Sequence, residues 1–139
     1  YKASEAGVKV DLIIRGVCTL KTGMPYSKKI RVIRIVDRYL EHARVFVFLN
    51  GGDHRIYMGS ADWMKRNLRS RVECVFPVYD PELKNELLSI LNIQLSDNVK
   101  ACELDKNLKN QRIINKGPDI RAQITIYEYF KNKYTIPKL

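Results

Sequence analysis

The sequence lacks several features that assign a function at once. It has no run of about 20 apolar residues, so it predicts no membrane-spanning helix. Its opening, YKASEAGVKVD, has no apolar core of a secretory signal, and because it starts in mid-pattern without methionine we interpret it as an excised fragment. It also has no GxxxxGK[ST] loop, no GxGxxG after a strand and no GxSxG turn. These absences argue against a glycine cradle for nucleotides and against a serine hydrolase.

Cysteine and histidine are scarce. The three cysteines are Cys18, Cys74 and Cys102, and the two histidines are His42 and His54. An odd number of widely spaced cysteines indicates reduced thiols in a cytosolic protein rather than a disulfide framework. Because CxxC, HxxxH and HExxH are all missing, we predict no metal site in this chain.

Positive charge is the feature that the sequence has in excess. Lysine and arginine number 25 against 15 acidic residues, which gives a net charge of +10 and a pI near 9.6. Such a balance predicts a polyanionic partner: nucleic acid, a nucleotide, polyphosphate or an anionic membrane surface. The basic residues are spread through patterned segments, which argues against a simple polybasic arm.

A length of 139 residues and an apolar fraction of 45% predict one folded domain, residues 1–139. We expect strands over residues 9–15, 44–49, 54–58, 72–78 and 99–104. We expect helices before Gly7 and over residues 27–42, 63–68, 80–95 and 119–134, with a solvated loop over 106–118. Alternating strands and amphipathic helices predict an α/β sandwich, and a hairpin turn at residues 50–53 makes its sheet mixed.

Two basic side chains are candidates for phosphate chemistry. Arg15 precedes Gly16 at the end of the first expected strand, where ligands collect in α/β sheets and where its planar fork of donors suits a phosphate. Pairing with a neighbouring carboxylate is the alternative. His42 can exchange a proton or carry a phosphoryl group, or it merely caps the end of the expected helix. We expect His54 to be an exposed residue at a strand start.

A second group of candidates follows in the segment GSADW, residues 59–63. Its small residues allow backbone amides to approach an anion, and Asp62 either orients an imidazole or caps the next turn. Downstream, arginines that include Arg66 surround Glu73, which we expect to hold guanidinium groups by ion pairing. A solvated charged face is the alternative for this cluster.

The combined string IRG, LEH, NGGD, SADWM and RVE, in this order, closely resembles the C-terminal part of long-form bacterial polyphosphate kinases, from ASEAG through at least Asp105. The resemblance implies reversible transfer of the terminal phosphate of ATP to inorganic polyphosphate. It also implies that the whole enzyme contains two phospholipase D-like domains that share one site. This chain resembles the last of these domains. The implied fold is therefore a phospholipase D-like α/β/α sandwich with a mixed sheet.

The resemblance extends to single residues. Arg15 matches the family arginine that contacts the ATP phosphates, and His42 matches the family's second histidine, an acid/base or electrostatic partner at the nucleotide. Asp62, Glu73 and Arg66 are expected in supporting roles, with Asp62 orienting and Glu73 positioning a basic neighbour. The phosphohistidine, the Mg²⁺ ligands and the adenine contacts are implied to lie in upstream domains.

Two departures from the family pattern limit this transfer. The phospholipase D superfamily has the motif HxK and a later motif GSxN. This chain instead has His42-Ala43-Arg44 and GSAD at residues 59–62. Arg44 cannot donate a proton near neutral pH, which puts phosphodiesterase chemistry in doubt but not phosphate binding. The loop over residues 21–29 looks shorter and more basic than in the family, so no contact is transferred to it.

The sequence therefore predicts a catalytic half-site of a polyphosphate kinase, working on ATP or ADP and polyphosphate with its upstream domains. We expect a cytoplasmic homo-oligomer without a specific nucleic acid, whose basic face allows a peripheral place at the inner membrane. The alternatives are a polyanion or nucleic-acid binding module without catalysis and a phospholipase D-like phosphodiesterase. As a hypothesis, the polyphosphate path is lined by Arg31, Arg34, Arg38, Lys65, Arg66 and Arg69.

Overall fold

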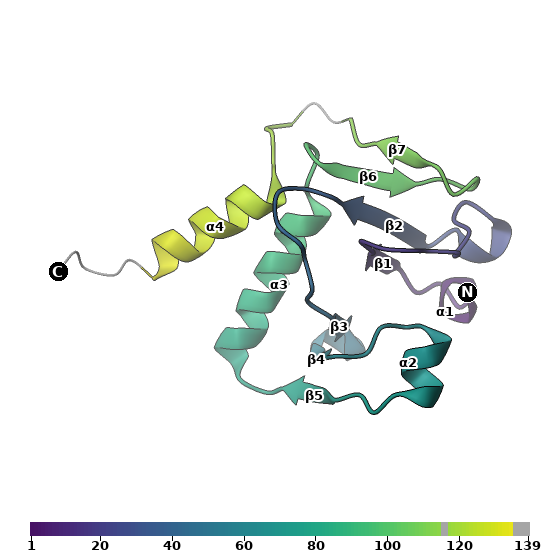
Figure 1. Ribbon diagram of the computed structural model, residues 1–139, viewed down its shortest axis with the longest axis horizontal. Helices are drawn as coiled ribbons and strands as arrows, with labels where there is room; N and C mark the ends of the chain where they lie inside the picture. Colours follow the sequence, from purple (N-terminus) through teal and green to yellow (C-terminus); the bar gives the residue numbers. More distant parts are fainter. Residues whose placement is uncertain (115–116, 135–139) are drawn as a thin grey trace. The chain divides into compact units, whose positions relative to one another are not determined.

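The computed structural model describes residues 1–114 and 117–134 (Figure 1). Its strands are β1 (Val10–Ile13), β2 (Ile30–Ile35), β3 (Val45–Phe48), β4 (Arg55–Gly59), β5 (Val75–Val78), β6 (Ala101–Leu104) and β7 (Asn110–Arg112). Its helices are α1 (Lys2–Glu5), α2 (Lys65–Ser70), α3 (Pro81–Leu95) and α4 (Ala122–Lys133), with 3₁₀ turns at Pro25–Ser27 and Asn50–Gly52. Over this described part, no helix combines the length and apolar character needed to cross a bilayer.

Contacts along the chain divide it into two compact units. The first unit comprises Tyr1–Leu40 together with Ile90–Leu139, and the second unit comprises Glu41–Ser89. Helix α3 starts in the second unit and ends in the first.

The first unit contains a mixed sheet in the order β1-β2-β6-β7. Strands β1 and β2 are parallel, whereas β2 with β6 and β6 with β7 are antiparallel (Figure 1). This confirms the predicted α/β class with a mixed sheet. Its mixed character, however, arises at β2 and not from the hairpin at residues 50–53, because that hairpin belongs to the sheet of the second unit.

The predicted helix over residues 27–42 is wrong, because Ile30–Ile35 form strand β2. Ile30 and Val32 belong to one buried cluster, whereas Ile33 and Ile35 belong to another that includes Ala122 of α4. A strand buried on both faces loses the alternation of apolar and polar residues that identifies exposed strands. Its β-branched residues are the remaining sign of a strand.

The second unit contains an antiparallel sheet in the order β3-β4-β5. The hairpin between β3 and β4 confirms the predicted turn, with Val45 opposite Met58 and Phe48 opposite Arg55. Gly51 and Gly52 adopt φ angles of 68° and 103° there. Glycine takes this left-handed region without a steric penalty, which explains the NGGD sequence.

Local signals also placed α3 correctly. The Asp80 carboxylate accepts a hydrogen bond from the Leu83 backbone N–H at 2.9 Å, and Pro81 is the first helical residue. Both features are typical helix starts. The predicted loop over 106–118 is wrong in one part, because residues 110–112 form the exposed strand β7 beside β6.

Candidate functional site around His42

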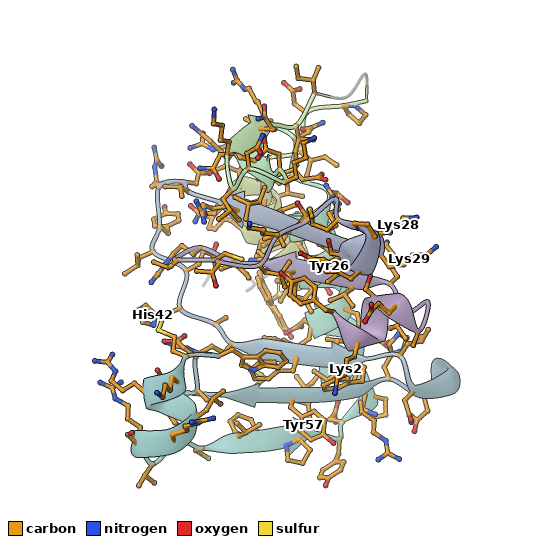
Figure 2. The ribbon with its side chains drawn as sticks, turned by 90° about the vertical axis from the view of Figure 1, so that its right-hand side faces the viewer. Lys2, Tyr26, Lys28, Lys29, His42 and Tyr57 are labelled. Atoms are coloured by element: carbon orange, nitrogen blue, oxygen red, sulfur yellow. The ribbon has the colours of Figure 1, made fainter. Side chains whose placement is uncertain are left out.

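His42 lies in a segment without regular secondary structure before β3 and is exposed to solvent (Figure 2). The alternative that it caps a helix is therefore wrong, since the expected helix over residues 27–42 is replaced by β2 and the segment after it. Arg44 is the residue two positions after His42.

Arg44 contacts both the ring and the backbone of His42. Its Nη1 lies 3.1 Å from the His42 Nδ1 and donates to the His42 carbonyl oxygen at 3.0 Å. On its other side, Arg44 is held by Asp62, with Nε to Oδ1 at 2.9 Å and Nη2 to Oδ2 at 3.3 Å. Two parallel charge-assisted bonds of this kind fix a guanidinium in direction as well as in place. Asp62, Arg44 and His42 thus form a continuous chain of contacts.

The charges of this group reinforce one another. The pKa of the Arg44 guanidinium is raised above its usual value, chiefly by its hydrogen bonds to Asp62 and further by the negative charges of Asp62 and Glu73. Arg44 is therefore a permanent cation and a permanent donor. The sequence led us to expect that Asp62 orients an imidazole or caps the next turn, whereas its carboxylate binds the guanidinium of Arg44.

Glu73 belongs to a second network beside this chain of contacts. The Ser60 hydroxyl donates to one Glu73 oxygen, and the Asn67 amide donates to the other at 2.7 Å. These hydrogen bonds hold the pKa of the Glu73 carboxyl below its usual value, and the charges of Arg71 and Arg44 add to the effect. Within the described residues, the hydrogen-bond donors to Glu73 are thus neutral groups, whereas the sequence led us to expect guanidinium partners.

The network also fixes the backbone of residues 59–62. The Gly59 N–H donates to the Arg44 carbonyl at 3.2 Å, and the Ser60 N–H donates to the Cys74 carbonyl at 2.9 Å. A Cβ on Gly59 would lie 2.4 Å from the Cys74 carbonyl oxygen, so this approach requires glycine. The amides of Gly59 and Ser60 are therefore both used by backbone partners.

Arg15 belongs to the first unit and is exposed two residues after β1. The carbonyls on either side of it are fixed by Arg34, whose Nη2 donates to Gly16 at 2.9 Å and whose Nε donates to Ile14 at 3.4 Å. Sequence reasoning missed this positioning role of Arg34. The signal that could have revealed this role is the pairing of β1 with β2. We did not foresee the pairing because we expected residues 27–42 to form a helix.

The hypothesis for a polyphosphate path needs correction at two positions. Arg31 is bound to Glu103 at 3.1 Å and to the Leu95 carbonyl at 3.3 Å. Arg34 also donates to Asn110 at 3.1 Å, in addition to its bonds beside Arg15. Both arginines therefore serve the first unit's own structure. Arg38 is exposed after β2, and the other members of the proposed path, Lys65, Arg66 and Arg69, are exposed on α2.

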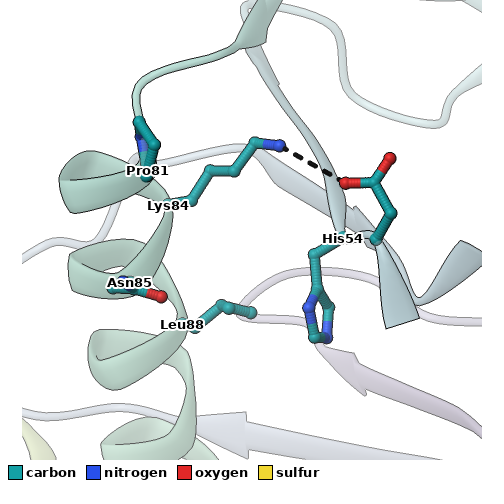
Figure 3. Close-up of a pocket in the computed structure, with 6 residues that line it drawn as sticks. His54, Pro81, Lys84, Asn85 and Leu88 are labelled. Atoms are coloured by element: carbon teal, nitrogen blue, oxygen red, sulfur yellow. Dashed lines mark ion pairs between the residues drawn. The ribbon is translucent and has the colours of Figure 1, made fainter.

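His54 lines a pocket of about 280 Å³ in the second unit (Figure 3). It is half-buried at the start of β4, whereas we expected an exposed residue. On the other wall, Lys84 of α3 lies 4.0 Å from Asp53. Because Asp53 is largely exposed, this ion pair contributes little to stability.

No metal-binding group of three or more His, Cys, Asp or Glu side chains exists within residues 1–114 and 117–134.

Comparison with known proteins decides the family. Residues 1–123 match the family described as "Polyphosphate kinase C-terminal domain 2". The chain belongs to this family. It is 49% identical over 135 residues to a polyphosphate kinase of Escherichia coli strain K12, and 50% identical over 134 residues to one of Yersinia pestis. These matches cover 95% and 94% of the chain but 20% and 19% of the relatives, so the chain spans about a fifth of their length.

A solved structure of the family confirms the predicted fold. The crystal structure of polyphosphate kinase from Porphyromonas gingivalis is similar with a TM-score of 0.93 and 53% sequence identity. The similarity covers 95% of this chain and 20% of that one. This agreement confirms the fold class predicted from the resemblance.

Proposed function

We propose that this polyphosphate kinase domain supplies part of the site that transfers the terminal phosphate of ATP reversibly to inorganic polyphosphate. The observation that carries the proposal is the family match over residues 1–123, a range that includes Arg15, His42, Arg44 and Asp62. The relatives in Escherichia coli and Yersinia pestis are named polyphosphate kinase, which supports the same reaction.

In this proposal, Arg15 and His42 contact the phosphates of ATP. Phosphoryl transfer depends mainly on positioning and on neutralising charge, which guanidinium and imidazole donors provide. Asp62 and Arg44 support His42, and Glu73 supports the segment that carries Asp62. We assign the phosphohistidine and the Mg²⁺ ligands to other parts of the enzyme.

The excess of positive charge supports polyphosphate as the second substrate. A chain of phosphates attracts cations by the same electrostatics that governs nucleic-acid backbones. The exposed Lys65, Arg66 and Arg69 of α2 are available for such contacts. We propose α2 as the part of the second unit that meets polyphosphate.

The test is the substitution His42→Ala in the natural polypeptide that carries this chain, with His54→Ala as the matched control. Loss of a group acting on the transferred phosphate should lower kcat/KM for polyphosphate synthesis from ATP by about 10² to 10⁴. His54→Ala should keep the wild-type rate. If His42→Ala also keeps that rate, the catalytic role is wrong, and polyanion binding without catalysis becomes the better account.

A further inference from the structure

We propose that Arg44, oriented by Asp62, is a positioning residue that places the single proton of neutral His42 on Nε2. The imidazole then presents an N–H donor to a phosphate oxygen. The identity of that ligand rests on the proposed function, whereas the proton placement rests on contacts inside the second unit.

The first step concerns the short contact between Arg44 and His42. A guanidinium has five N–H donors and no acceptor, so its partner in any hydrogen bond must be the acceptor. The Arg44 Nη1 lies 3.1 Å from the His42 Nδ1, and this ring nitrogen therefore accepts. A neutral imidazole carries one proton, which must then be on Nε2.

The second step concerns how firmly Arg44 is held. Asp62 binds two guanidinium nitrogens through both of its carboxylate oxygens. The same Nη1 that meets the ring also donates to the His42 carbonyl at 3.0 Å, and the Arg44 carbonyl accepts from Gly59. Backbone and side chain of Arg44 are therefore both fixed, and the half-buried guanidinium keeps its Nη1 beside the His42 ring.

The third step concerns what the ring can do. With Nδ1 facing a guanidinium and Nε2 protonated, the neutral ring has no nitrogen lone pair ready to attack phosphorus. It can instead donate from Nε2 to a phosphate oxygen, which is an acceptor. His42 is exposed, so a ligand can reach this donor. The geometry thus favours a binding and charge-stabilising role over a phosphate-carrying role.

The direct test is the ¹⁵N spectrum of the histidine-labelled 139-residue chain at a pH where the ring is neutral. The chain has two histidines, so His54→Asn leaves the signals of His42. We expect Nδ1 to resonate as an unprotonated nitrogen and Nε2 as a protonated one. Arg44→Met should mix the two tautomers, whereas Lys84→Met, which removes a cation elsewhere in the same unit, should not. A proton on Nδ1, or an unchanged spectrum in Arg44→Met, overturns the proposal.

A kinetic pair separates this inference from the proposed function. In the natural polypeptide, the amide of His42→Gln reaches the place of Nε2, whereas the amide of His42→Asn reaches that of Nδ1. If Nε2–H is the donor, the Gln variant should retain about tenfold more kcat/KM than the Asn variant. If both variants lose the same activity, the proton placement on Nε2 is wrong but the proposed function stands. If both variants keep wild-type activity, the proposed function is wrong, whichever ring nitrogen carries the proton.

Discussion

At the scale of single residues, the spacing of two positions between His42 and Arg44 determines the candidate site. The sequence pointed to His42 as a candidate, but it placed the residue at a helix end. The predicted helix ended at His42 and the predicted strand began at Arg44, so no common element related the two side chains. In the structure neither residue lies in a helix, and the Arg44 guanidinium contacts the ring and the carbonyl of His42. The error in secondary structure thus concealed this contact.

Asp62 and Glu73 show what motif reasoning does and does not provide. The string SADW pointed to Asp62 as a residue that orients an imidazole, and in the structure its carboxylate binds the Arg44 guanidinium. Glu73 lies among arginines in the sequence, yet its oxygens accept from Ser60 and Asn67. The choice among nearby donors depends on the tertiary path of residues 59–74, which composition does not reveal.

The Glu73 network predicts a pH-dependent contribution to stability. Because the folded-state pKa of Glu73 lies below the ordinary value of about 4.3, the ionised carboxylate stabilises the folded chain above that pH. This contribution is lost as the pH falls through the folded-state pKa. Glu73→Gln should therefore lose less stability on acidification than the wild type, as measured by urea unfolding at neutral and acid pH. Identical losses would contradict this role.

At the scale of elements, strand β2 shows where sequence patterns fail. Its apolar residues at positions 30 and 33 fit a helix, but Ile30–Ile35 are buried on two faces of a sheet. By contrast, the hairpin at Gly51-Gly52 and the start of α3 at Asp80-Pro81 depend on local backbone chemistry. Local signals of this kind predict structure well, whereas burial on two faces depends on partners distant in the sequence.

Asp97 joins the start of β6 to the start of α4. Its side chain is 1% exposed and accepts hydrogen bonds from the backbone N–H groups of Val99, Lys100, Ala101 and Ala122, at 2.7 to 3.0 Å. Removing it leaves buried donors without their acceptor. We expect Asp97→Ala to lower the free energy of unfolding by about 3 kcal/mol.

The measurement for Asp97 is equilibrium unfolding in urea, with Asp53→Ala as control. Asp53 is exposed and pairs with Lys84 at 4.0 Å, so its removal should cost less than about 1 kcal/mol. Equal losses in the two variants would show that the four hydrogen bonds of Asp97 are not important for stability.

At the scale of the whole molecule, the family resemblance predicted the family correctly, but no feature of the sequence indicated the two units. One unit boundary falls between Ser89 and Ile90, inside the continuous helix α3. A boundary within a helix produces neither a glycine- or proline-rich linker nor a change in composition, which explains why none was seen.

Burial is unevenly distributed between the units. Both buried apolar clusters belong to the first unit, whereas Ile56 and Ala61 are the buried apolar residues among those described in the second. Segments with fewer buried contacts open more often. Backbone amides of β4 should therefore exchange with solvent about tenfold faster or more than those of β2 in the 139-residue chain. Equal or slower exchange in β4, measured by NMR, would contradict this difference.

We expect that Arg44, held by Asp62, makes His42 competent to act on a phosphate. The direct test is kcat/KM for polyphosphate synthesis from ATP by the natural polypeptide with Arg44→Lys. A lysine keeps the charge but cannot bind both Asp62 oxygens and the His42 Nδ1 at once, so we expect a loss of about tenfold or more. Arg55→Lys, an exposed change on β4, should keep the wild-type value. An Arg44→Lys variant as active as the wild type would contradict the account.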